Sequence, residues 1–338
     1  MLILSNGLTD TADEGFLKVA TSLIKRLKLK NPETMVVSYE RKSKITDRYI
    51  ELNKLLLNKE LLFLLRKNKD SFLYIPFPAR MIATALRVFI LSLFSKQRVN
   101  VLLVMKNDAD FFTKFFFKIS RANIIVLSEE SADFYRDFLS NERVKYIKAG
   151  VDTDMFTPVN PEVSRSLKIK YGFNPEKPVI LHVGHLNKGR NVAQLMKINP
   201  EYQVLLVTST LTKNEQDKEL KKKLLDTPNI KIIDEYVPSI KEVYQLSDVY
   251  FFPVVEQCNC IDIPLSCLEA AACNLPIITT LYGAMKEFKG KKDFYFIDSF
   301  ENINEIISKV LNEENVSSRE SVLEYDWKNA VCMLNKLK

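Results

Sequence analysis

The fold is decided by residues 249–280, VYFFPVVEQCNCIDIPLSCLEAAACNLPIITT. The apolar run at 249–253 predicts a strand, and the apolar spacing of 265–273 predicts a helix. A second β-branched run at 277–280 predicts the next strand. A strand–loop–helix–strand unit places its loop and its helix start at the carboxyl edge of a parallel sheet, where α/β proteins bind ligands.

One residue of this stretch needs an explanation. Glu269 lies between Leu268 and three alanines, so its carboxylate is expected to be buried. A buried carboxylate is costly unless it is paired or hydrogen-bonded. The same stretch carries a second acid, Asp262, in the loop before the helix. Both acids are therefore candidates for a ligand site.

Strands and helices alternate along the rest of the chain. Strands are expected at 2–6, 35–39, 72–75, 99–105, 123–127, 144–147, 178–183, 203–208, 230–233 and 294–297, and helices at 11–30, 50–67, 81–96, 108–121, 128–139 and 163–171. Alternation of this kind predicts parallel, doubly wound sheets. A turn-rich segment, 148–158, separates two such runs. We therefore expect an N-terminal domain at 1–150 and a second domain after it.

Composition limits the class of protein. A chain of 338 residues with 46% hydrophobic residues can form two cores. Its apolar runs are shorter than a membrane span, and its first residues do not resemble a signal peptide. The five cysteines are odd in number and lie in the second half, which indicates a cytoplasmic protein without disulfides. Cys258 and Cys260 have no second pair beside them, so no zinc site is expected.

The charge is concentrated in the first half. Residues 1–150 contain 26 Lys and Arg against 16 Asp and Glu, whereas the remainder contains 23 against 26. The net charge of +7 thus comes from a first half that should meet something anionic, such as nucleic acid, phospholipid or a phosphorylated acceptor. Cation-edged apolar helices at 80–98 and 114–121 are either core helices or a surface that docks on anionic lipid. Nucleic acid is disfavoured because the cations follow helix periodicity.

A second candidate site is the segment 182–191, HVGHLNKGRN. A strand ends at Gly184, and a loop with two cations leads toward a helix expected near Asn191. Lys188 and Arg190 suit a pyrophosphate, although a solvated basic loop would have the same composition. The segment is neither a Walker A loop nor a GxGxxG motif. The two histidines of the chain both lie here; His182 is expected to pack in the strand and His185 to face the ligand.

Three segments resemble retaining GT-B glycosyltransferases of family 4, also called glycosyltransferase group 1. Residues 147–158, IKAGVDTDMFTP, are similar to the family's interdomain join, and 183–191, VGHLNKGRN, to its phosphate loop. Residues 268–287, LEAAACNLPIITTLYGAMKE, are similar to its donor motif. The resemblance implies two Rossmann-like domains facing a cleft, the second at 151–320. It also implies a C-terminal helix at 321–338, marked by Trp327, that crosses back to the first domain.

The resemblance implies roles for single residues. Glu269 falls on the second glutamate of the family's donor motif, which holds the ribose hydroxyls. Ile261 stands where the first glutamate is expected, so Asp262 is the stand-in for that group. Catalytic roles fall to Asp262, Arg190 and Lys188, which together with the amides around Gly184 would stabilise the leaving diphosphate. The donor-binding set is Gly184, His185, Arg190, Glu269, Leu268, Ile263 and Pro264.

The first domain is expected to hold the acceptor. The acceptor-side candidates are Gly7, Asp13, Gly15 and Asp108, although Asp108 and Asp110 also suit the start of a helix. The acceptor itself is expected to be a glycan or a lipid-linked group, with the protein at the membrane surface. No metal and no cofactor are expected beyond the nucleotide-diphosphate sugar. The missing first glutamate leaves an alternative, a catalytically silent protein that binds nucleotide sugars.

Overall fold

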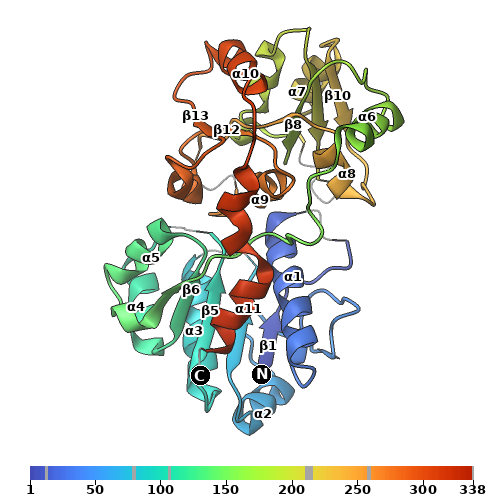
Figure 1. The fold of residues 1–338 in the computed structure, drawn as a ribbon. Helices are drawn as coiled ribbons and strands as arrows, with labels where there is room; N and C mark the ends of the chain where they lie inside the picture. Colours follow the sequence, from blue (N-terminus) through green and yellow to red (C-terminus); the bar gives the residue numbers. More distant parts are fainter. Residues whose placement is uncertain (12–13, 78–80, 106–107, 210–215, 257–259, 337–338) are drawn as a thin grey trace. The chain divides into compact units, whose positions relative to one another are not determined.

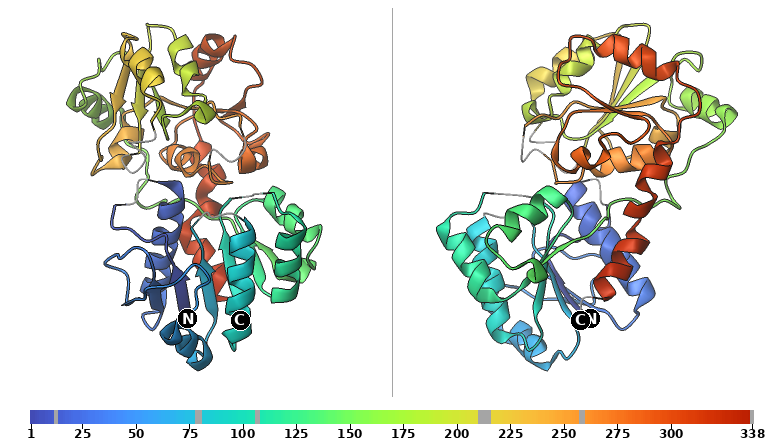
Figure 2. Two further views of the ribbon diagram at one scale, coloured as in Figure 1. Left: turned by 180° about the vertical axis from the view of Figure 1, so that it is seen from behind. Right: turned by 60° about the vertical axis from the view of Figure 1, so that its left-hand side comes forward.

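The structure is a computed structural model that describes residues 1–11, 14–77, 81–105, 108–209, 216–256 and 260–336. The chain forms two compact units. The first unit contains Met1–Ala149, Ile261–Ile263 and Trp327–Lys338, and the second contains Gly150–Cys260 and Pro264–Asp326. Each unit is an α/β layer structure around one parallel sheet, as Figures 1 and 2 show. The two doubly wound units expected from the sequence are thus confirmed.

The first unit is built on a seven-stranded sheet with the order β3-β2-β1-β4-β5-β6-β7. All its neighbouring strands are parallel. Its elements are β1 (Leu2–Ser5), α1 (Gly15–Lys30), β2 (Met35–Ser38), β3 (Arg48–Tyr49), α2 (Lys59–Lys67), β4 (Phe72–Ile75), α3 (Met81–Phe94), β5 (Val99–Leu103), α4 (Phe111–Ser120), β6 (Asn123–Val126), α5 (Glu129–Arg136), a 3₁₀ turn (Asn141–Arg143), β7 (Val144–Tyr146) and α11 (Trp327–Asn335).

The two faces of this sheet are covered by different helices. Leu2 and Leu4 of β1 point into a core that α2, α3, α4 and α5 close, while Ile3 is buried on the other face. Helix α11 packs along α1, where Asn31 donates to Asn335 Oδ1 at 3.0 Å. Both ribbons run side by side in Figure 1 and in the two views of Figure 2. Right-handed crossovers in opposite directions from β1 and β4 produce this two-sided cover.

The second unit has a six-stranded parallel sheet with the order β10-β9-β8-β11-β12-β13. Its buried face against α7, α10 and a 3₁₀ segment is formed by aliphatic and aromatic residues such as Ile180, Leu206 and Phe251. Its elements are α6 (Pro161–Lys170), β8 (Val179–Val183), 3₁₀ segments (Lys188–Arg190 and Val192–Lys197), β9 (Gln203–Val207), α7 (Lys218–Leu225), β10 (Ile230–Ile233), α8 (Ile240–Gln245), β11 (Val249–Phe252), α9 (Leu265–Ala272), β12 (Ile277–Thr279), a 3₁₀ segment (Gly283–Phe288), β13 (Phe294–Phe296), α10 (Ile303–Leu311) and a 3₁₀ segment (Ser318–Tyr325).

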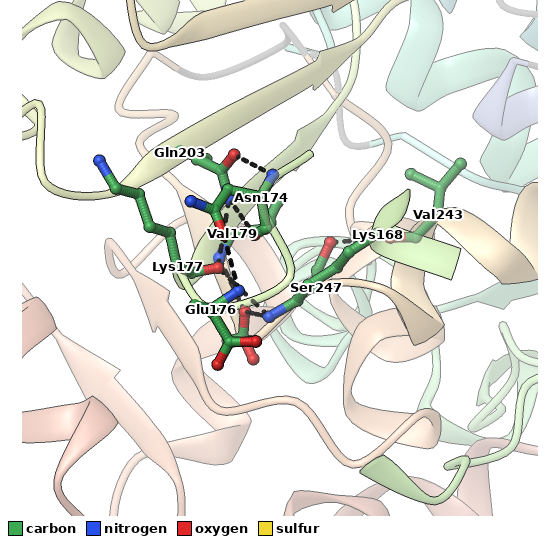
Figure 3. Close-up of polar contacts among 9 residues, drawn as sticks. Lys168, Asn174, Glu176, Lys177, Val179, Gln203, Val243 and Ser247 are labelled. Atoms are coloured by element: carbon green, nitrogen blue, oxygen red, sulfur yellow. Dashed lines mark hydrogen bonds and ion pairs between the residues drawn. The ribbon is translucent and has the colours of Figure 1, made fainter. Parts of the chain in front are cut away.

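A buried lysine ties α6 to the sheet of the second unit (Figure 3). Lys168 has 6% of its surface exposed, and its ammonium lies 2.8 Å from Asp248 Oδ2. The same ammonium donates to Lys177 O at 3.3 Å, and Asp248 accepts the N–H of Val179 at 2.7 Å. Gln203, at the start of β9, bonds both the N–H and the C=O of Asn174. These bonds fix the segment that leads from α6 into β8.

Most expected elements are confirmed within one or two residues, but the helix expected at 50–67 is wrong in its first half. The helix begins only after Asn58, whose side chain accepts from the N–H groups of Glu60 and Leu61. Asn53 accepts from Leu55 N and Leu57 N, and Leu56 has a left-handed φ of 59°. These side-chain bonds favour turns over a helix. The two-residue strand β3 was not expected, because it has no apolar run of its own.

Two further expectations concern helix starts and membrane spans. Helix α1 begins at Gly15, later than the expected residue 11. Ser128 caps α5 as expected, accepting from Ser131 N at 3.1 Å. In the described part of the chain, every helix is too short or too polar to cross a membrane.

Candidate functional site

The strand order of the second unit defines where a ligand can bind. From β8 the chain moves outward to β9 and β10, and then returns to the other side of β8 as β11. The carboxyl ends of β8 and β11 therefore meet at the topological switch point, where open α/β sheets bind ligands. The expected phosphate loop follows β8 and leaves from this point.

His182, near the end of β8, is completely buried and neutral. Its Nδ1 lies 2.8 Å from the carbonyl oxygen of Phe251, so Nδ1 carries the proton and donates it. Burial lowers the pKa of His182 to about 4, and the charge of Arg190 acts in the same direction. The Nε2 atom is buried and has no hydrogen-bond partner among the described residues. His182 thus packs in the strand, as expected, but it also presents an unpaired acceptor.

Arg190 gives the strongest indication of what kind of ligand the site binds. Only 7% of its surface is exposed, and its Nε has no hydrogen-bond partner in the described part of the chain. A Cβ added to Gly184 would lie 3.2 Å from Arg190 Nη1 and 3.0 Å from His182 Nε2. Gly184 therefore leaves room beside a buried cation and a buried acceptor. A buried guanidinium without an acidic partner favours an anion as its ligand.

The loop between Gly184 and Asn191 has a different backbone from the one expected. A helix start near Asn191 was predicted, but only 3₁₀ segments follow, because Asn191 has a left-handed φ of 55°. Asn187 caps the first segment by accepting from Arg190 N at 3.0 Å, and Asn191 Nδ2 donates to Pro253 O at 3.2 Å. The Gly184 N–H donates to Val207 O at 3.0 Å, so this amide is already used. Side chains, more than a helix terminus, supply the positive charge.

The remaining two loop candidates are less enclosed. Lys188 is exposed, and His185 is half-buried and has a partner of its own. Lys188 and Arg190 thus differ in burial by a wide margin although they are two residues apart. Of these two cations, Arg190 is the one that is buried.

Glu269 is buried in α9 with 4% of its surface exposed, as expected. Its Oε2 accepts a hydrogen bond of 2.6 Å from the hydroxyl of Tyr244 on α8. Burial, followed by the charge of Glu269, raises the pKa of Tyr244 well above its usual value, so the phenol keeps its proton and donates. The sequence did not identify Tyr244, because the contact joins helices from two different crossovers.

Other candidates of this unit shape the start of α9. Pro264 precedes the helix, and its carbonyl accepts from Cys267 N at 3.0 Å. Leu268 is fully buried and packs on Gly150, where an added Cβ would lie 2.6 Å from Leu268 Cδ1. Further along the chain, Tyr282 fixes Cys260 through two bonds, accepting from its N–H at 2.9 Å and donating to its C=O at 2.7 Å.

Asp262 and its two neighbours belong to the first unit. Asp262 is buried, and its Oδ2 accepts from the hydroxyls of Ser131 and of Ser128, the latter at 3.4 Å. Its own N–H donates to Val104 O at 3.0 Å. Ile261 packs against Gly15, and Ile263 is fully buried. The role of Asp262 as a stand-in for a glutamate stays a prediction, and its described neighbours are the hydroxyls at the start of α5.

Three of the acceptor-side candidates, Gly7, Gly15 and Asp108, are described in the first unit. Gly7 follows β1, and an added Cβ would overlap the ring of Phe16. Asp108 is exposed before α4, and Asp110 caps that helix by accepting from Thr113 N at 2.8 Å, which lowers the pKa of Asp110. Asp13 lies outside the described residues. Sequence reasoning missed Asn6, which links Glu40 and the Phe77 backbone at the switch point between β1 and β4.

Among the described residues, no group of three or more His, Cys, Asp and Glu side chains is placed to hold a metal ion.

Comparisons with known proteins concern the family and the fold of the chain. Residues 177–313 match the family model described as "Glycosyl transferases group 1". Comparison with the curated proteins gives no match. A glycosyltransferase from Rickettsia africae is similar in structure, with a TM-score of 0.77, 14% identity, and coverage of 99% of this chain and 96% of that one.

Two further solved structures have the same fold. The Anabaena protein HepE, solved in complex with UDP, has a TM-score of 0.74 at 13% identity and covers 99% of this chain and 98% of its own. WaaG, a glycosyltransferase involved in lipopolysaccharide biosynthesis, has a TM-score of 0.63 at 12% identity, with coverage of 100% and 96%. At these identities the likeness concerns the fold. The resemblance is confirmed: residues 177–313 match glycosyltransferase group 1, and the whole chain has the two-unit fold of solved glycosyltransferases.

Proposed function

We propose that this protein is a glycosyltransferase that moves a hexose from a nucleotide-diphosphate sugar to an acceptor, with retention of configuration and without a bound metal. The observation that carries the proposal is Arg190. Its guanidinium is buried beside Gly184 at the switch point and lacks an acidic partner among the residues that the structure describes. An uncompensated buried charge costs several kcal/mol, and a diphosphate would compensate it.

The chemistry of the site supports a diphosphate as the ligand. Arg binds phosphate oxygens through its planar fork, and Lys188, exposed two residues earlier, adds a mobile point charge. His182, neutral with its proton on Nδ1, adds no positive charge; its Nε2 can accept only from a donor such as a hydroxyl and does not itself bind the diphosphate oxygens. The cations would stabilise the negative charge that develops on the leaving diphosphate, which is the main requirement for breaking the sugar–phosphate bond.

Glu269 suits the nucleoside part of the donor. Its carboxylate has two oxygens with several acceptor positions, and Tyr244 uses one of them. A ribose offers two adjacent hydroxyl donors, which a fixed carboxylate can accept. Because HepE has been solved with UDP and with UDP-glucose, UDP-sugars are the donors to test first.

The acceptor is proposed to be a glycan or a lipid-linked group at an anionic membrane surface. The support is the charge of the first half, 26 Lys and Arg against 16 Asp and Glu. An acceptor or a surface with phosphate groups would meet this charge favourably. The protein would then act at the cytoplasmic face of the membrane, where it would use nucleotide sugars as substrates.

A second candidate is a silent protein that binds nucleotide sugars without transferring them. It is favoured by Ile261, which stands where the family has its first glutamate and packs against Gly15. It is also favoured by Asp262, whose carboxylate is bound by Ser131 and Ser128. A transferase would need another group near the reacting carbon.

The test combines binding and turnover. UDP-, GDP- and ADP-hexoses are screened for an increase in the melting temperature of the protein, and the donor that stabilises it is then incubated with and without EDTA. We expect slow release of free sugar from one donor, insensitive to EDTA, with the anomeric configuration retained in the product. Stabilisation without sugar release would favour the silent binder, and the absence of both would contradict the pocket itself.

A further inference from the structure

Helix α4 of the first unit has an outer face of exposed aromatic side chains. Phe111, Phe112 and Phe115 have 76%, 59% and 46% of their surface exposed, and Ile119 has 40%. Four of the ten residues of one short helix are therefore large apolar groups in contact with solvent. Exposed apolar residues scattered singly are normal, but a continuous patch on one helix indicates an interaction surface.

The helix geometry separates this face from the core. At 100° per residue, Phe111, Phe115, Ile119 and Phe112 lie within an arc of about 100°. Thr113, Phe117 and Ser120 lie on the opposite side and are buried. Phe116 lies between the two faces, its ring 5.7 Å from that of Phe89 on α3. The core is thus complete without the outer phenylalanines.

The charged residues on the helix itself are all positive. Lys118 lies next to Phe111 and Phe115 on the helix surface, and Lys114 lies one step further round, with its ammonium 5.6 Å from the Phe138 ring. Arg121 is exposed directly after the helix. Residues 111–121 contain no acid. Asp110 stands at the amino end, where its carboxylate is engaged in the helix cap, and Asp108 precedes it.

We propose that the outer face of α4 (Phe111, Phe112, Phe115, Ile119, with Lys114, Lys118 and Arg121) docks on an anionic lipid bilayer. The apolar arc would enter the boundary between headgroups and acyl chains, and the cations at its edge would meet the lipid phosphates. This charge pattern is the reason for choosing a bilayer over a protein partner. The inference deepens the proposed function by naming the surface that would bring the acceptor domain to its lipid.

The helix is held well enough for its outer face to be changed. The Arg143 guanidinium donates to Phe117 O at 2.7 Å, Lys118 O at 3.1 Å and Ala122 O at 2.9 Å, which closes the carboxyl end of α4. Asp110 closes the amino end. Substitutions of the exposed phenylalanines should therefore leave the helix in place, with the Phe115–Phe116 ring contact at 5.7 Å as the contact that is lost beside the core.

The experiment measures binding of the full-length protein to sedimented vesicles, with no nucleotide sugar present. Vesicles of phosphatidylcholine are compared with vesicles that contain phosphatidylglycerol. We expect binding to the anionic vesicles that weakens severalfold when the salt concentration rises, because screening shortens the reach of the cations. The variant Phe111→Ser/Phe112→Ser/Phe115→Ser should lose about tenfold or more in partitioning. The matched control Phe63→Ser removes an equally exposed phenylalanine (62%) on α2 and should bind like the wild type.

A single charge substitution gives a second test that changes the helix less than the triple variant does. Lys118→Glu should weaken binding about tenfold, whereas Lys222→Glu, the same change at an exposed lysine of the second unit, should have little effect. Circular dichroism checks that each variant is folded. The proposal is overturned if the wild type ignores anionic vesicles, or if both α4 variants bind them like the wild type. It is also overturned if the patch proves to hold a second copy, seen as a wild-type dimer that the triple variant converts to a monomer.

Because the assay uses no donor, its outcome is independent of the proposed reaction. If the protein binds UDP but not vesicles, only the proposed membrane surface is contradicted. If it binds vesicles but not UDP, only the proposed donor pocket is contradicted.

Discussion

Single residues carry most of what is new about the proposed donor site. The sequence located Arg190, Gly184 and Glu269, since a buried carboxylate in an alanine-rich helix and a basic loop after a strand are visible in the pattern. It could not reveal that Tyr244 donates to Glu269, or that Asp262 lies against Ser128 and Ser131. Such contacts join residues far apart in the chain, and the hydrophobic pattern holds no information on them.

His182 predicts how stability depends on pH. Its pKa is about 4 in the folded protein, below the usual 6.5, so the unfolded chain binds a proton more readily between these values. The contribution of His182 to the free energy of unfolding should therefore be fully present above pH 6.5. It should be lost as the pH drops toward 4, by about 3 kcal/mol in total. Urea titrations at several pH values measure this slope.

The variant His182→Asn should show a flatter stability curve over the same range. His185→Gln, which removes the other histidine of the chain, should keep the wild-type slope. If His182→Asn keeps the full slope, the loss of stability at low pH comes from other groups.

At the scale of elements, strands were easier to predict than helix boundaries. Phe72–Ile75 and Ile230–Ile233 were both confirmed to the residue. Phe72–Ile75 is apolar and buried throughout, as expected for a strand covered on both faces, whereas Ile230–Ile233 is an edge strand in which Lys231 is exposed. The false helical half at 50–57 has apolar residues at helical spacing, yet the side chains of Asn53 and Asn58 bond the backbone in turns. Strand β3 exists because Val37 and Ser38 pair with Arg48 and Tyr49, which local sequence cannot show.

The Lys168–Asp248 pair is predicted to hold α6 and the start of β8 to the sheet. Removing one member of a buried pair leaves the other uncompensated. Because Asp248 is about one third exposed, Lys168→Met should lower the free energy of unfolding by about 1–3 kcal/mol, less than for a fully buried pair. Lys170→Met is the matched control, since the Lys170 side chain is 59% exposed in its pair with Glu242. It should cost less than about 1 kcal/mol.

A double-mutant cycle with Asp248→Asn separates the pair from its surroundings. A coupling near zero between Lys168 and Asp248 would mean that Lys168 stabilises the unit only through its hydrogen bond to Lys177 O and its packing.

At the scale of the molecule, the last helix belongs to the first unit although it follows the second in sequence. Helix α11 buries Trp327, Val331 and Leu334 in the unit that contains α1. The sequence indicated this return only through the resemblance to a family. The hydrophobic pattern of a terminal helix does not indicate which of the two cores the helix will join.

The single tryptophan of the chain, Trp327, therefore reports on the first unit. Leu334→Ala, at 2% exposure, should lower the urea midpoint followed by Trp327 fluorescence, with a cost of about 2–4 kcal/mol. Met333→Ala, at 40% exposure on the same helix, should cost much less. Equal midpoints for the two variants would argue against docking of α11 in that core.

The most direct test of the central claim is the affinity for UDP measured by calorimetry. We expect the wild type to bind UDP and Arg190→Gln to bind about 30- to 1,000-fold more weakly, because a buried charged contact contributes about 2–4 kcal/mol. Arg165→Gln, at an exposed arginine of the same unit, should bind like the wild type. A folded Arg190→Gln variant with wild-type affinity for UDP would contradict the assignment of the diphosphate site.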